Sequence, residues 1–135
     1  MATAQEVFER MLRGPVADAL HELGFTGTFR HFSLRSGDFK AVIEFKKSRY
    51  STAQEIPSYW ALLSILHLPS GTRPWGEVML RGILPDAREQ PLYSLTAKQT
   101  PSEAARKLIA DLQDYGYPAI AAEIERLRSL DDLDG

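Results

Sequence analysis

The chain has 135 residues, a net charge of −2, and apolar and charged fractions of 44% and 25%, which are typical of one globular domain. It has no cysteine, which excludes disulfides, thiolate metal sites and a thiol nucleophile. Charges interrupt the first 25 positions, and no stretch approaches the ~20 apolar residues of a membrane helix. We therefore expect a cytoplasmic protein that does not enter a membrane.

The N-terminal segment has the pattern of an amphipathic helix. Apolar residues recur at helical spacing over residues 7–23, and Thr3 with Glu6 fits a capping box. Gly14 and Pro15 interrupt this pattern. Because proline removes a helical hydrogen bond and clashes with the preceding turn, we expect a kink near Pro15 or two abutting helices.

Strand-like segments follow this helix. Residues 28–34 form a short aromatic stretch, and residues 35–38 have the composition of a hairpin turn. Residues 39–47 alternate between apolar and polar side chains, which predicts a half-buried strand with one wet face. The residues predicted to face the core are Phe39, Ala41, Ile43 and Phe45.

The next predicted strand, over residues 59–68, is almost wholly apolar. We expect a central strand that is covered on both faces and ends at residues 69–71. Weaker strand patterns occur at residues 77–84 and 92–95, with a loop at residues 85–91 between them.

The C-terminal part is predicted to be helical. Thr100 to Glu103 combines an N-cap, a proline at the first helical position and a capping-box glutamate. We expect Gly116 to end this helix, Pro118 to begin a last one, and residues 131–135 to form an acidic frayed tail.

Together these elements predict a single α+β domain over residues 1–130. Its N-terminal helix is kinked near Pro15, its antiparallel sheet has about four to six strands, and its two C-terminal helices pack on the sheet.

Charge is distributed unevenly along the chain. Residues 123–135 carry five acids and two arginines, whereas residues 28–49 carry two acids and six cations. The basic middle and the acidic end either meet in the fold or face different partners. The six cations are Arg30, Arg35, Lys40, Lys46, Lys47 and Arg49.

The end of the 39–47 strand concentrates donors. Lys47 and Arg49 share the parity of the core face, so either the strand extends beyond the core or a bulge redirects these side chains. Guanidinium and hydroxyl groups suit a carboxylate or a phosphate. The alternative is an ordinary strand end with solvated cations and a serine/threonine turn. The candidate anion-binding or partner-binding residues are Lys46, Lys47, Ser48, Arg49 and Tyr50.

Other chemistry-bearing residues are scattered. No two histidines have the spacing of a helical metal site, and no serine lies in a Gly-x-Ser-x-Gly motif, so we expect no metal and no cofactor. His67, at a strand end, is a candidate acid–base group, although a core histidine is the plainer interpretation. Trp75, between Pro74 and Gly76, is a candidate interface residue, although core packing explains most such aromatics.

Residues 22–51 contain a specific combination of motifs: Leu23-Gly24-Phe25, Phe32, Gly37-Asp38, Phe45 and Lys47-Ser48. This combination resembles the bacterial family called domain of unknown function 4304, with weaker matches at Arg81-Gly82, residues 92–95 and Tyr117-Pro118. The resemblance implies a bacterial, cytoplasmic, single-domain α+β protein, and it carries over no catalytic residue. Small families of this kind include immunity proteins, which neutralise toxins.

Two hypotheses of function follow. The first is a non-enzymatic protein-interaction module, such as an immunity protein, whose cations face an acidic surface of another protein. The second is a protein or enzyme that holds a phosphate or carboxylate at Lys47, Ser48 and Arg49, with His67 as its acid–base group. The negative net charge disfavours nucleic-acid binding.

Overall fold

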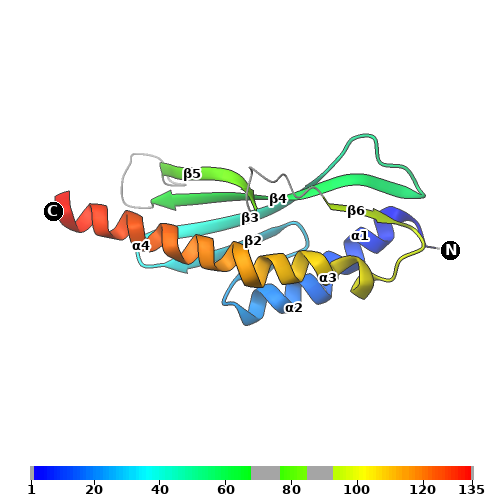
Figure 1. Ribbon diagram of the computed structural model, residues 1–135, viewed down its shortest axis with the longest axis horizontal. Helices are drawn as coiled ribbons and strands as arrows, with labels where there is room; N and C mark the ends of the chain where they lie inside the picture. The colour runs from blue at the N-terminus through cyan, green and yellow to red at the C-terminus, as the bar shows by residue number, and fades with distance from the viewer. Residues whose placement is uncertain (1, 68–76, 85–92, 135) are drawn as a thin grey trace.

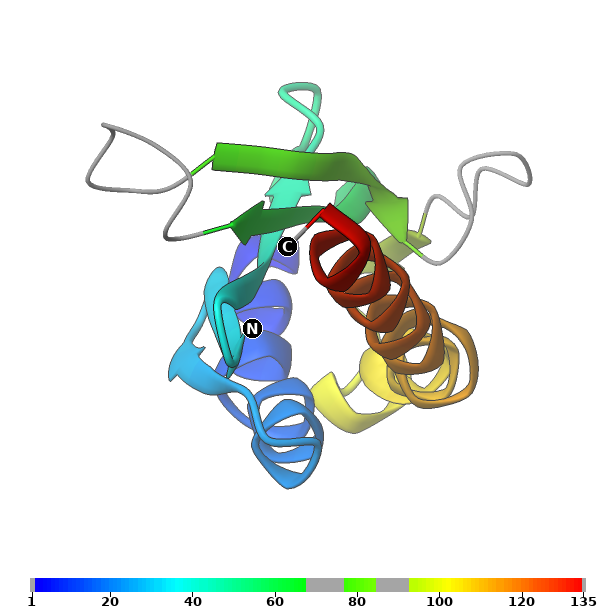
Figure 2. The same cartoon turned by 90° about the vertical axis from the view of Figure 1, so that its left-hand side faces the viewer.

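The computed structural model describes residues 2–67, 77–84 and 93–134. Helices form one layer and an antiparallel sheet forms the other (Figure 1). The helices lie on one side of the sheet, and no helix of the described ranges covers the opposite face (Figure 2). The predicted α+β class, with one domain and helices packed on an antiparallel sheet, is confirmed.

The N-terminal helix is divided, as predicted, at the Gly14-Pro15 pair. Helix α1 spans Ala4–Arg13 and helix α2 spans Pro15–Glu22, with Gly14 in a non-helical conformation between them. Pro15 is tolerated because the first residues of a helix have no intrahelical partner for their N–H groups. The Thr3 side chain accepts a hydrogen bond from the Glu6 N–H at 3.2 Å, so half of the predicted capping box is present.

Within the described ranges the sheet has six antiparallel strands, a number within the predicted range. Its order is β1-β2-β3-β4-β5, and β6 pairs with the first part of β4. Tyr59 of β4 pairs with Lys47 on one side and with Tyr93 of β6 on the other. The strands are β1 (Thr26–Thr28), β2 (His31–Ser36), β3 (Phe39–Lys47), β4 (Glu55–His67), β5 (Glu77–Leu84) and β6 (Tyr93–Thr96).

The prediction of one strand over residues 28–34 is wrong, because a turn at Phe29 and Arg30 divides it into β1 and β2. Phe29 has a positive φ of 63°, which is uncommon for a bulky residue and gives no signal in the sequence. The Arg13 and Arg30 guanidinium carbons lie 4.5 and 5.0 Å from the centroid of the Phe29 ring. These cation–π contacts hold the aromatic side chain over the turn.

The predicted core face of β3 is confirmed, since Phe39, Ala41, Ile43 and Phe45 are all buried, but Val42 on the predicted wet face is buried as well. Strand β4 begins at Glu55, four residues before its predicted start, and Pro57 lies within the irregular pairing between Ile56 and Tyr59. The prediction that this strand is covered on both faces is wrong. Its helix-side residues are buried, whereas Trp60, Leu62 and Leu66 on the other face are half-buried.

The C-terminal helices form one continuous run. Helix α3 (Pro101–Asp111) continues through a π-helical segment (Leu112–Gly116) into α4 (Tyr117–Asp134). Gly116 therefore does not end the helix, contrary to prediction. Pro118 has no N–H to donate, and in a regular α-helix its ring would clash with the carbonyl group one turn earlier. The wider π turn accommodates the proline. Residues 131–134 are helical, where we expected a frayed tail.

A buried tyrosine joins the two layers. The Tyr59 ring contacts the Phe8 ring edge-on at 5.3 Å and stacks on the Tyr93 ring at 5.3 Å. The Tyr93 hydroxyl donates a hydrogen bond to Asp111 Oδ2 at 2.7 Å and so ties β6 to α3. Burial raises the pKa of Tyr59 and of Tyr93, and the Asp111 carboxylate raises the pKa of Tyr93 further.

Candidate functional site

The donor-rich segment predicted as a site lies at the tip of the β3–β4 hairpin. The β3–β4 ladder is regular from the Phe39–His67 pair to the Lys47–Tyr59 pair. Strand β3 therefore extends beyond the core without a bulge, which decides between the two predicted geometries. We call residues 46–50 the tip patch: Lys46, Lys47, Ser48, Arg49 and Tyr50.

Ser48 uses its polar groups within the turn. Its N–H donates to Ser58 O at 2.9 Å, and its hydroxyl oxygen accepts from the Tyr50 N–H at 3.1 Å. The Ser51 hydroxyl donates to Ser48 O at 2.6 Å. This is the serine/threonine turn of the plainer sequence interpretation. The Ser48 oxygen is engaged as an acceptor, which leaves its hydroxyl hydrogen for a ligand.

The base of this loop is fixed to the rest of the fold. The Ala4 N–H donates to Ala53 O at 2.7 Å, and the Ala97 N–H donates to Gln54 O at 2.8 Å. The Thr52 hydroxyl oxygen accepts from the Glu55 N–H at 3.2 Å. These bonds connect the hairpin to the start of α1 and the end of β6, so the tip patch stands on an ordered support.

The two lysines point to opposite faces of the sheet. Lys46 lies opposite Trp60 and forms an ion pair with Glu44 at 3.2 Å. Both side chains are partly exposed to solvent, so this ion pair contributes little to the stability of the fold. Lys47 lies on the helix side opposite Tyr59, is half-buried, and pairs with no carboxylate within the described ranges.

Arg49 and Tyr50 form a unit at the tip. An Arg49 terminal nitrogen donates to the Tyr50 hydroxyl at 3.1 Å, and the guanidinium carbon lies 5.2 Å from the Tyr50 ring centroid. Tyr50 is 70% exposed, and it is the sole exposed large hydrophobic residue in the part of the chain that is described. The tip therefore presents an aromatic ring and a guanidinium directly to solvent.

The remaining predicted site residues do not join the tip patch. His67 lies opposite Phe39, with ring centroids 4.9 Å apart, at the other end of the ladder from Lys47. Lys47 is eight positions beyond Phe39 along the strand, or about 26 Å at ~3.3 Å per residue. Trp75 lies outside the described residues. No cluster of three or more metal-ligating side chains occurs among those that the structure places.

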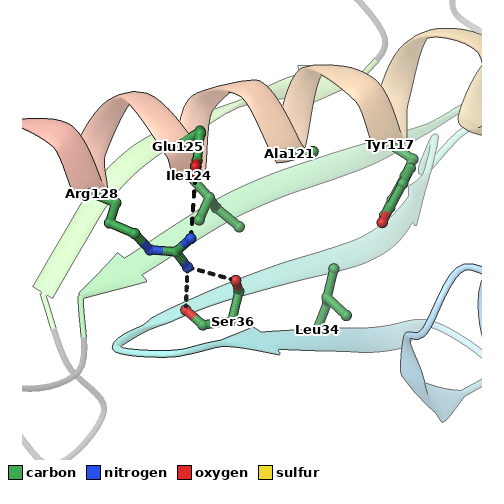
Figure 3. Close-up of a pocket in the computed structure, with 7 residues that line it drawn as sticks. All are labelled: Leu34, Ser36, Tyr117, Ala121, Ile124, Glu125 and Arg128. Carbon is green, nitrogen blue, oxygen red and sulfur yellow. Dashed lines mark hydrogen bonds and ion pairs between the residues drawn. The ribbon is translucent and has the colours of Figure 1, made fainter.

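A second candidate site, which sequence reasoning missed, is a pocket of about 310 Å³ between β2 and α4 (Figure 3). Leu34 and Ser36 of β2 form one wall, and side chains from α4 form the other. Tyr117 and Arg128 point from α4 toward the sheet at opposite ends of the pocket (Figure 3). The α4 residues that line it are Tyr117, Ala121, Ile124, Glu125 and Arg128.

Arg128 fixes one end of this pocket. Its Nη2 donates to Ser36 Oγ at 2.9 Å and to Ser36 O at 3.5 Å, and its Nη1 donates to Glu125 Oε2 at 3.2 Å (Figure 3). Ser36 and Arg128 are 92 positions apart in the chain. The spacing of Tyr117, Ala121, Ile124 and Arg128 places them on one helical face, which is the one signal in the sequence.

Among the described side chains, no ion pair joins the basic residues 28–49 to the acidic residues 123–135. Arg126 pairs with Glu123, and Arg128 with Glu125, each three residues apart on α4. The hydrogen bond from Arg126 lowers the pKa of Glu123. Among the described side chains, Lys46 of the tip patch pairs with Glu44, whereas Lys47 and Arg49 form no ion pair.

Comparison with protein-family models, curated proteins and solved structures finds no significant match to this chain. Within the described ranges, no helix combines the length and apolarity that crossing a bilayer requires.

Proposed function

We propose that this chain is a non-enzymatic protein-interaction module that binds its partner through the tip patch. The observation that carries the proposal is the exposed Tyr50 ring with Arg49 stacked beside it. Tyrosine and arginine dominate the energetics of protein interfaces because they combine a large contact area with polar groups. An ordered hairpin that presents both side chains requires little ordering when it binds.

The partner we propose has an acidic surface. Lys46, Lys47 and Arg49 lie within four consecutive positions, and Glu44 pairs with only one of them. Complementary charge accelerates association and makes it dependent on salt. An immunity-like role, in which the module covers an acidic surface of a toxin, fits this chemistry. It stays a proposal, as do bacterial origin, a cytoplasmic location and membership of the resembled family.

The alternative function is a site for a small phosphate or carboxylate at Lys47, Ser48 and Arg49. The geometry supports it less well. Arg49 already donates to the Tyr50 hydroxyl and is stacked on the Tyr50 ring. His67, the proposed acid–base group, lies at the far end of the β3–β4 ladder. A site that recognises a free anion needs several donors that converge on one point.

Affinity capture from a lysate of the source cells tests the proposal. Wild-type protein is compared with Lys47→Glu/Arg49→Glu, and bound proteins are identified by mass spectrometry. The matched control is Arg10→Glu/Arg106→Glu, which makes the same charge change at exposed helical positions. We expect one stoichiometric protein in the wild-type and control captures and its loss from the tip-patch variant. Equal retention by all three proteins would reject the tip patch.

A further inference from the structure

We propose that the pocket between β2 and α4 binds a small organic monocarboxylate with an apolar body. This inference is independent of the proposed function. The pocket lies beside the β2–β3 turn, where Ser36 pairs with Phe39, and the tip patch lies at the other end of β3. That separation is about 26 Å along the strand. The two sites can therefore be tested separately.

The pocket has the size and wall chemistry of a small-molecule site. Its volume of about 310 Å³ lies at the lower end of the range of ~300–1,000 Å³ that is typical for such sites. Leu34 forms the sheet side and Ile124 the helix side, with Ala121 between Tyr117 and Ile124 along α4 (Figure 3). Ala121 carries a single methyl group, so the space beside it is left open.

Arg128 provides the anion-binding end. Ser36 holds its guanidinium through Nη2, so the cation is oriented before any ligand arrives. The Arg128 Nε group has no acceptor among the described residues, and a carboxylate accepts from a guanidinium through two oxygens. The ligand therefore places its carboxylate at Arg128 and its apolar body along Leu34 and Ile124.

Glu125 indicates which ligand charge the pocket favours. It already supplies a carboxylate to Arg128 at 3.2 Å, and it is the competitor that a ligand displaces. The Glu125 side chain is 67% exposed and that of Arg128 is 43% exposed, so their pair is weak in water. One guanidinium beside one carboxylate favours a monoanion over a phosphate dianion, because Glu125 repels additional negative charge.

Tyr117 lies at the opposite end and is the first residue after the π-helical segment. Single π turns within α-helices occur frequently at functional sites, because the extra residue redirects the side chains that follow. Here the turn precedes the face of α4 that lines the pocket. Tyr117 offers an aromatic surface with a hydroxyl group, which suits the distal end of an apolar ligand.

Titration of the full chain with octanoate and with benzoate, read by two-dimensional amide NMR, tests the assignment. We expect saturable one-site binding, with shifts concentrated at residues 34–36 and 117–128. 1-Octanol and octylamine carry the same apolar body without the carboxylate and should bind at least tenfold more weakly. The failure of both acids to bind, or equal binding of octanol and octanoate, would overturn the proposal.

Three variants sharpen the test. Ala121→Leu fills the pocket at an exposed helical position that tolerates leucine, and should weaken octanoate binding at least tenfold. Glu125→Gln removes the competing carboxylate and should strengthen binding. Arg128→Gln removes the cation and should weaken binding at least tenfold. Unchanged binding in Ala121→Leu, or weaker binding in Glu125→Gln, would contradict the assigned pose.

The tip-patch variant separates this inference from the proposed function. Lys47→Glu/Arg49→Glu should bind octanoate as the wild type does, because neither residue lines the pocket. A loss of octanoate binding in that variant would place the acid at the tip patch and overturn the assignment to the pocket.

Discussion

The Arg49 guanidinium stacks against the Tyr50 ring, with 5.2 Å between the guanidinium carbon and the ring centroid, and also donates to the Tyr50 hydroxyl at 3.1 Å. Adjacent residues in a strand alternate in direction, so it is the turn at Ser48 that brings these two side chains together. Among the described residues, neither side chain belongs to the hydrophobic core or packs against it. The stability of the fold therefore does not explain why Arg49 and Tyr50 are exposed.

Tyr50→Ala should separate binding from folding. Because Tyr50 is 70% exposed, we expect its free energy of unfolding in urea to stay within ~0.5 kcal/mol of wild type. Affinity for the captured partner should fall by about 2 kcal/mol or more, as for a hot-spot residue. Isothermal titration calorimetry measures that loss. A large fall in stability with unchanged affinity would show that Tyr50 is structural.

Two glycines, Gly27 in β1 and Gly37 in the β2–β3 turn, predict losses of different size for the same substitution. Gly27 has φ +113°, and a Cβ built there would lie 2.3 Å from the backbone oxygen of His31. Gly37 has φ +60°, and its nearest contact would be the Arg128 side chain at 3.7 Å. Asparagine tolerates the left-handed conformation near φ +60° but not a collision with backbone.

We therefore expect Gly27→Asn to destabilise the fold by at least ~2 kcal/mol and Gly37→Asn by less than ~1 kcal/mol. Urea unfolding followed by circular dichroism measures both variants under the same conditions. Equal losses at the two positions would contradict the described close contact of Gly27 in β1 with the backbone of His31 in β2.

Tyr59 predicts a loss of stability in alkali. Burial raises its pKa in the folded state, whereas the unfolded chain ionises near the ordinary value of about 10. Below pH 10 the folded and the unfolded chain both keep the tyrosine proton, so ionisation of Tyr59 does not reduce the free energy of unfolding. Above pH 10 the unfolded state loses protons first, so stability falls by up to ~1.4 kcal/mol per pH unit for each such tyrosine.

Tyr59→Phe isolates this contribution, because among the described residues the Tyr59 hydroxyl has only a long contact, to Met11 Sδ at 3.8 Å. At pH 8 the variant should be within ~1 kcal/mol of wild type, and between pH 10 and 11 its stability should fall less steeply. Urea titrations at each pH test the difference. Parallel curves would show that Tyr59 ionises normally in the folded protein.

Helix capping predicts a smaller effect. The Thr100 hydroxyl accepts from the Glu103 N–H at 3.2 Å, and Glu103 accepts from the Thr100 N–H at 3.2 Å, so both halves of the box at α3 are present. Thr100→Ala should cost about 1 kcal/mol in the free energy of unfolding. Thr100→Ser keeps the oxygen and should cost less. Equal losses in the two variants would show that the cap contributes nothing.

Much of the fold was predictable because the signals are local. The alternation from Phe39 to Phe45 identified the buried face of β3, and Gly14-Pro15 identified the division between α1 and α2. Each depends on residues that are neighbours in the chain, where side-chain period or proline geometry decides the outcome.

The predictions from sequence were wrong or incomplete where contacts between residues far apart in the chain determine the local structure. Arg13 and Arg30 hold Phe29 in a turn that its own sequence does not favour. The β2–α4 pocket depends on the contact between Ser36 and Arg128, which are 92 positions apart in the chain, and no local sequence pattern predicts that contact. At the tip, the residue types were identified from sequence, but the use of Ser48 within its own turn required the structure.

The most direct test of the central claim is the affinity of the purified partner for wild type, Lys47→Glu/Arg49→Glu and Arg10→Glu/Arg106→Glu at low and high salt. We predict that the control binds as wild type does and that the tip-patch variant binds at least tenfold more weakly. We also expect the affinity of wild type to fall with salt. Equal affinity of all three proteins, with no dependence on salt, would contradict the claim that the tip patch binds an acidic surface.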